Sequence, residues 1–170
     1  MKNVCLIPAR GGSKRLPKKN IKLFHNKPLI AWSIEEAISS KIFDEVFVST
    51  DDEEIADISK NFGAKIPFIR PKELANDHAN DKDVRNHFIN WMKTNNIHSN
   101  YLCYLYATAP FINKETLLGC LELLINNDVT CTHTITSYDY PVQRALERDE
   151  KGLVEFKWDD YANSRSQDLE

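Results

Sequence analysis

Five basic side chains gather in one short stretch near the start of the chain. Residues 7–20 have the sequence IPARGGSKRLPKKN, whose cations are Arg10, Lys14, Arg15, Lys18 and Lys19. The neighbouring Gly11 and Gly12 allow positive φ and a close approach of the backbone, so amide groups can face phosphate oxygens. Arginine and lysine supply matching charge. The stretch predicts a polyphosphate-binding loop, and a solvated basic loop is the alternative.

The rest of the chain does not share this charge. It has 22 Lys and Arg against 25 Asp and Glu, a net charge of −3, so there is no chain-wide basic surface and we expect no nucleic-acid partner. Neither G-x-x-x-x-G-K-[ST] nor G-x-G-x-x-G occurs. The basic loop is therefore a local feature, and it belongs to neither common nucleotide-binding motif.

Composition predicts one globular domain over residues 1–170. The chain is 42% hydrophobic and 28% charged, which is typical of a protein with a packed core. No apolar run is long enough to span a membrane, and the amino terminus becomes charged too early for a signal peptide. Its four cysteines, at 5, 103, 120 and 131, show no C-x-x-C spacing. They indicate reduced structural thiols in a cytoplasmic protein without a membrane partner.

Apolar runs of strand length alternate with amphipathic runs of helix length. We expect strands at 3–8, 45–50, 64–69, 101–107 and 128–136, helices at 28–40, 51–63, 82–96 and 114–127, and a hairpin arm at 150–158. This order predicts an α/β fold with a mostly parallel sheet and helices on both faces. In such sheets ligands bind beyond the carboxyl ends of the strands, where the basic loop follows the first strand.

Few other residues have the spacing of a catalytic or metal site. Asp51 and Asp52 suit either a metal or the amino-terminal cap of the helix that follows them. Cys131 and His133 lack two further ligands for zinc, and the five histidines form no H-x-x-x-H pair. No residue stands out as a catalytic base.

Longer motifs resemble a known enzyme family. The stretches LIPARGGSKRLPKKNI, KPLIAWSI and VSTDDEEIA resemble the amino-terminal part of the sialic-acid-type cytidylyltransferases, which activate nonulosonic acids as CMP-sugars. LYATAPF, YPVQRAL and RSQDL are more similar to the pseudaminic acid branch than to the neuraminate branch. The resemblance implies a Rossmann-like nucleotidyltransferase that binds CTP and Mg²⁺, releases pyrophosphate and works as a homodimer.

The resemblance also implies roles for individual residues. For binding CTP it implies Arg10, Gly12, Ser13, Lys19, Asn20 and Arg70, the last two at the cytidine. For the sugar it implies Tyr106, Thr108, Gln143, Arg144 and Gln167, and for catalysis Arg10, Lys19 and Arg165. An arginine fork suits the sugar carboxylate, and the cations would neutralise charge on the leaving pyrophosphate. For Arg70, a surface ion pair is the alternative.

The chain departs from the family pattern at three places. Tyr106 stands where the neuraminate enzymes have Gln, which indicates a different sugar or a different contact to it. Ala79 and Asp81 stand where relatives often have Ser or Thr near the nucleotide. Relatives also continue past RSQDL into a segment with an Asp-bearing metal motif, so we expect the metal ligand beyond residue 170. We expect a piece of a longer enzyme, and a short form without metal ligands is the alternative.

Three functions follow from the resemblance. The first is synthesis of CMP-pseudaminic acid from CTP for surface glycans. The second is synthesis of CMP-N-acetylneuraminate or CMP-legionaminate, which sugar-side residues such as Tyr106 and Gln143 would distinguish. The third, from a different class, is a truncated CTP-binding module without turnover.

Overall fold

The buried run NVCLIP forms the central strand of a parallel sheet. In the computed structural model, β1 (Asn3–Pro8) lies between β4 (Glu45–Ser49) and β5 (Tyr101–Tyr104), in the order β4-β1-β5. Both neighbours run parallel to β1, with Cys5 opposite Val46 on one side and opposite Cys103 on the other. A strand that is covered on both faces needs apolar side chains at successive positions, and the sequence of β1 meets this requirement.

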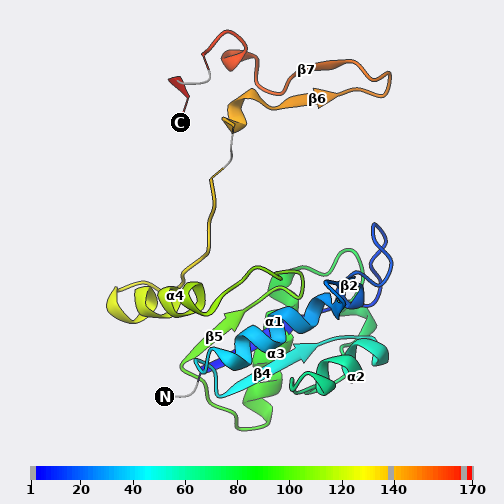
Figure 1. Cartoon of the computed structure of the whole chain (residues 1–170), viewed down its shortest axis with the longest axis vertical. Helices are drawn as coiled ribbons and strands as arrows, with labels where there is room; N and C mark the ends of the chain where they lie inside the picture. Colours follow the sequence, from blue (N-terminus) through cyan, green and yellow to red (C-terminus); the bar gives the residue numbers. More distant parts are fainter. Residues whose placement is uncertain (1–2, 138–139, 166–167, 170) are drawn as a thin grey trace. The chain divides into compact units, whose positions relative to one another are not determined.

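Helices cover both faces of this sheet, as predicted (Figure 1). The described residues form four α-helices: α1 (Leu29–Ser39), α2 (Glu53–Asn61), α3 (Asp81–Thr94) and α4 (Lys114–Asn126). Cys5 and Ile7 belong to the core beneath α1 and α2, whereas Val4 and Leu6 belong to a second core with Phe88 of α3. Successive strand residues point to opposite faces, so β1 supplies both cores.

Side-chain caps set where the helices begin. The Asp52 carboxylate accepts a hydrogen bond from the Ile55 amide at 3.0 Å at the start of α2. At the start of α3, Asn80 and Asp83 form a reciprocal capping box. Asp52 is therefore a helix cap, one of the two interpretations that its position allowed.

Two predicted strands are wrong. Residues 64–69 make only two isolated bridges, Lys65 with Phe47 and Ile69 with Thr50, because Pro67 between them has no amide hydrogen for a ladder. Residues 128–136 form no strand either. Their alternation of Thr with apolar residues has the period of a strand, but a strand also needs a pairing partner.

The structure describes residues 3–137, 140–165 and 168–169, which fall into two units, residues 1–132 and 133–170. In the second unit β6 (Leu146–Arg148) pairs with β7 (Val154–Phe156), so the hairpin arm predicted at 150–158 is confirmed for β7. A single nucleotidyltransferase domain over the whole chain stays a prediction.

Two short elements complete the first unit: β2 (Leu23–Phe24) and β3 (Lys27–Pro28) form a small hairpin after the basic loop. No helix in the described part of the chain is long and apolar enough to cross a membrane. The four cysteines are free thiols; Cys5 is buried and Cys131 is exposed.

Candidate active site

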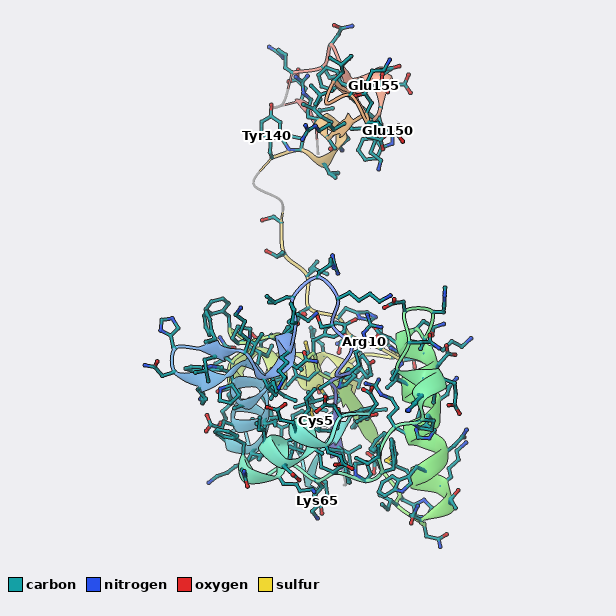
Figure 2. All side chains as sticks on the ribbon, turned by 90° about the vertical axis from the view of Figure 1, so that its right-hand side faces the viewer. Cys5, Arg10, Lys65, Tyr140, Glu150 and Glu155 are labelled. Carbon is teal, nitrogen blue, oxygen red and sulfur yellow. The ribbon has the colours of Figure 1, made fainter. Side chains whose placement is uncertain are left out.

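A cavity of about 780 Å³ lies beyond the carboxyl ends of β1 and β5. Pro8, the last residue of β1, and Tyr104, the last residue of β5, both line it. The structure brings together here seven of the residues predicted for the site: Arg10, Ser13, Lys19, Asn20, Arg70, Tyr106 and Thr108. Figure 2 shows Arg10 in the upper part of the first unit and Cys5, which is buried, below it. The site is where an α/β sheet places its ligands.

Three contacts hold the basic loop against the sheet. The buried Asn20 side chain donates to the Arg10 carbonyl at 3.0 Å, and the Gly11 amide donates to the Asp51 carboxylate at 3.0 Å. At the far end, Lys18 forms an ion pair with Glu54 of α2. Asn20 therefore positions the loop through its side-chain amide, and Asp51 anchors the glycine pair.

The two glycines of the loop differ in their surroundings. Neither Gly11 nor Gly12 has positive φ; the glycines that do are Gly63 and Gly152, at 93° and 87°. A Cβ on Gly11 would stand 2.6 Å from an Asp52 carboxylate oxygen, whereas one on Gly12 would meet nothing within 4 Å. Gly11 is needed for its close approach to the cap of α2. Gly12, predicted at the triphosphate, does not line the cavity.

A carboxylate of the neighbouring loop pairs with the loop cations. Asp77 lies 2.9 Å from the Arg10 guanidinium and 2.5 Å from the Lys14 ammonium. Arg10 also donates to the Asn76 carbonyl at 2.8 Å. Hydrogen bonds from Lys14 and Arg10 lower the pKa of Asp77. The cations are thus already oriented toward an anion, but these ion pairs are exposed and weak in water.

Arg70 is the buried cation of the site. It is 4% exposed, so the alternative of a surface ion pair is wrong. Its Nε and Nη2 atoms have no hydrogen-bond partner among the described residues, and its nearest carboxylate oxygen, on Asp51, is 3.9 Å away. Burial lowers its pKa, which Asp51 opposes. Buried donors in native proteins are almost always paired, so Arg70 is set up to donate to a bound molecule.

Two tyrosines meet one carboxylate across the cavity. Tyr104 donates to Asp81 at 3.0 Å, and Tyr106 donates to the other oxygen of the same carboxylate. Burial raises the pKa of Tyr104, and the hydrogen bond to Asp81 raises that of Tyr106. Sequence reasoning named Tyr106 but missed Tyr104 and the shared partner. Their spacing of two residues in the strand predicted at 101–107 was the available signal, although β5 ends at Tyr104.

The remaining predicted residues lie in the second unit. Arg144 donates to the carbonyls of Tyr161, Ala162 and Ser164, the last at 2.6 Å, which ties that unit together. Arg165 forms a two-pronged ion pair with Asp168. Gln143 lies in a short 3₁₀ helix (Val142–Arg144), and Gln167 is outside the described residues. Their part in the site stays a prediction.

Comparison with known proteins identifies the family. A model of the cytidylyltransferase family matches residues 4–162. The chain belongs to this family. It is 46% identical over 99% of its length to a pseudaminic acid cytidylyltransferase of Campylobacter jejuni and spans 73% of that protein. It is 37% identical over 72% of its length to a CMP-N,N'-diacetyllegionaminic acid synthase of Legionella pneumophila, and spans 53% of that one.

A solved structure supports the fold. CMP:2-keto-3-deoxy-manno-octonic acid synthetase complexed with CTP matches 75% of this chain with a TM-score of 0.62 and 26% identity. The match covers 48% of that chain, so this chain spans about half of its length. The predicted α/β nucleotidyltransferase fold and the resemblance to the cytidylyltransferases are both confirmed.

The predicted magnesium ion stays a prediction for this cavity. The described residues contain no group of three or more His, Cys, Asp or Glu side chains that could hold a metal. Of the carboxylates lining the cavity, Asp77 pairs with two cations and Asp81 accepts from two tyrosines. Mg²⁺ is commonly bound by one or two carboxylates together with substrate phosphates, so the predicted metal would bind together with CTP. A metal ligand beyond residue 170 stays a prediction.

Proposed function

We propose that this chain is a cytidylyltransferase that activates pseudaminic acid with CTP for surface glycan synthesis. The reaction joins the anomeric hydroxyl of the sugar to the α-phosphorus of CTP and releases pyrophosphate. The observation that carries the proposal is the cavity that joins the cationic loop to the buried Arg70, whose Nε and Nη2 have no hydrogen-bond partner among the described residues, in a chain so similar to the Campylobacter jejuni enzyme. Such a cavity offers the charge of the loop cations and, beside them, the hydrogen-bond donors of the buried Arg70.

The loop end suits the triphosphate. Arg10, Ser13 and Lys19 line the cavity there. Because Asp77 holds Arg10 only through an exposed ion pair, a triphosphate with several negative charges can replace it. The cations would then neutralise the charge that grows on the departing pyrophosphate, with Lys19 and Arg10 as the catalytic cations.

The buried end suits the base. Cytosine carries two acceptors, a carbonyl oxygen and a ring nitrogen, next to each other on one edge. The unpaired Nε and Nη2 of Arg70 are two neighbouring donors with a fixed spacing. Pairing them with this edge would satisfy both buried groups and place the triphosphate toward the loop.

Catalysis by these residues rests on position and charge. The sugar hydroxyl must approach the α-phosphorus in line with the departing oxygen, and holding both reactants in this geometry supplies much of the rate. We propose that Thr108 and Tyr106, at the cavity, contact the sugar. Gln143, Arg144, Arg165 and Gln167 belong to the same sugar-side proposal, with Arg165 near the reacting phosphate.

Three further features complete the proposal. Mg²⁺ would accompany CTP and would neutralise part of the charge on its phosphates. The working enzyme would be a homodimer. A cytoplasmic location agrees with four free thiols, because reducing compartments keep cysteines unpaired.

Two alternatives remain for the same site. The similarity to the legionaminic acid enzyme favours CMP-legionaminate synthesis as the next candidate. For CMP-N-acetylneuraminate synthesis, Tyr106 would have to take the role that a glutamine has in the neuraminate enzymes. A CTP-binding module without turnover is the alternative of a different class.

Pyrophosphate release tests these functions. The purified chain is supplied with CTP and Mg²⁺ together with pseudaminic acid, a legionaminic acid or N-acetylneuraminic acid. We expect release with pseudaminic acid and little with the other two. Preference for another sugar contradicts the substrate. CTP binding without release from any sugar contradicts the enzymatic proposal and favours the binding module.

A further inference from the structure

Asp81 connects two positions at which this chain departs from the neuraminate enzymes. It is the first residue of α3, and Tyr106 follows β5, 25 residues further along the chain. Tyr104, the last residue of β5, donates to the same carboxylate. A Ser33 hydroxyl, which is fully buried, donates to the Tyr106 carbonyl at 2.9 Å and holds the backbone of Tyr106. The tyrosine pair is therefore anchored by both its backbone and its hydroxyl groups.

The carboxylate determines what the hydroxyl groups can bind. An ionised carboxylate only accepts hydrogen bonds, so each tyrosine donates its one hydroxyl hydrogen to Asp81. Each hydroxyl oxygen can then only accept further hydrogen bonds, through its lone pairs. The cluster of Asp81, Tyr104 and Tyr106, which we call the acceptor cluster, thus offers oxygens that accept hydrogen bonds and a negative charge. It favours a ligand N–H or O–H group and disfavours a carboxylate.

We propose that the acceptor cluster is a specificity subsite that binds an acylamino N–H group of the sugar, with Asp81 as the positioning residue for Tyr106. The inference rests on the proposed function. Pseudaminic acid carries acylated amino groups, whose N–H can only donate. The negative charge of Asp81 would also turn the carboxylate of the sugar away, toward the cations of the loop.

Exposure favours the sugar as the ligand of Tyr106, the open side of this subsite. Arg70 is 4% exposed, whereas Tyr106 is 54% exposed, so Tyr106 stands at the open side of the cavity and Arg70 at its buried side. The base belongs with the buried arginine. The incoming sugar belongs at the open side, where Tyr106 presents its hydroxyl oxygen.

The experiment measures sugar binding and CTP binding separately. Calorimetry gives the Kd of pseudaminic acid for the chain saturated with CMP, and the Kd of CTP for the chain alone. We expect Tyr106→Phe and Asp81→Asn each to raise the Kd of the sugar about 3- to 10-fold, the usual effect of one hydrogen bond. The Kd of CTP should stay within about twofold. In the Tyr106→Phe background Asp81→Asn should add little, because it acts through the lost hydroxyl.

Two matched variants control for side effects. Tyr101→Phe removes a hydroxyl from the same strand outside the cavity lining, and Asp83→Asn removes a carboxylate from the same helix turn. Neither should change sugar binding. Ultraviolet titration of tyrosine gives a readout that needs no ligand: Asp81→Asn should lower the raised pKa of Tyr104 and Tyr106.

The outcomes are distinct for the two proposals. An unchanged sugar Kd in Tyr106→Phe, or a raised CTP Kd with unchanged sugar Kd, overturns the subsite; the second result would assign the cluster to the base. A wild-type chain that binds no sugar overturns it as well. Sugar binding that depends on the cluster, but without pyrophosphate release, contradicts only the enzymatic proposal.

Discussion

Replacing Arg70 by methionine should stabilise the ligand-free chain and weaken CTP binding at once. Arg70→Met keeps an unbranched apolar stem in the buried space and removes two donors that have no hydrogen-bond partner among the described residues. The backbone contact, from the Arg70 amide to the Thr50 carbonyl at 2.7 Å, is unaffected. The variant therefore separates the effect of the buried charge on the stability of the ligand-free chain from its effect on CTP binding.

The structure sets the size of each effect. A buried donor without a partner costs about 1–3 kcal/mol. The loss of the attraction to Asp51 opposes this gain. That attraction is weak, because the two groups are 3.9 Å apart and Asp51 also accepts a hydrogen bond from the Gly11 amide. A net gain of about 1 kcal/mol would raise the Tm by about 2–4 °C for a chain of this length. Loss of hydrogen bonds from a charged donor, about 1.5–3 kcal/mol, would raise the Kd of CTP about 10- to 150-fold.

The assay is calorimetric melting of both proteins with and without CTP, and titration with CTP. Arg148→Met, an exposed arginine of β6 outside the cavity, serves as the control and should change neither quantity. A ligand-free Arg70→Met protein that melts several degrees below the wild type, with unchanged CTP affinity, would refute the reasoning. Arg70 would then support the fold and not the ligand.

Three other perturbations test the loop and the cavity. Gly11→Ala should lower the free energy of unfolding by about 1–3 kcal/mol, because the new Cβ meets the cap of α2; Gly12→Ala, which meets open space, should stay within about 0.5 kcal/mol in the same urea titration. Lys19→Ala should raise the Kd of CTP about 10-fold and lower turnover, measured by pyrophosphate release; unchanged values would remove Lys19 from the site. Because the pKa of Tyr104 is raised in the folded state, the unfolded chain loses that proton first, so stability should fall above pH ~10. Tyr104→Phe should lessen this fall in urea titrations across that range, and an identical fall would contradict it.

The spacing of apolar residues was enough to predict the strands and helices that define the fold. The apolar run at 3–8 and the helical spacing at 28–40 predicted β1 and α1 almost to the residue, because burial on both faces or along one stripe leaves a direct mark on sequence. The position of the basic loop at the end of β1 followed from the same topology. The predicted strand at 128–136 failed because alternation shows that a strand could form, not that a neighbour is present to pair with it.

The parts that sequence could not supply depend on contacts between distant segments. That Arg70 is buried follows from how residues beyond α2 fold over the sheet edge, and nothing in FIRP marks it. Asp81 and Tyr106 each looked like an isolated departure from the family. Their contact across 25 residues joins them, and spacing along the chain holds no information on such a pair. The loop glycines likewise differ in role because of Asp52, 41 residues away from Gly11.

The position of β1 in the sheet has a consequence for how the chain acquires its site. β1 is synthesised before both of its partners, and one of them, β5, lies nearly a hundred residues later, with Asn3 opposite Tyr101. Pairing of such distant segments carries a large loop-closure entropy and slows folding. The cavity lining extends from Pro8 to Thr108, so a nascent chain shorter than this has an incomplete cavity. We therefore expect CTP to stabilise only chains in which β5 has already docked, and the apolar edge of β1 to depend on chaperones until then.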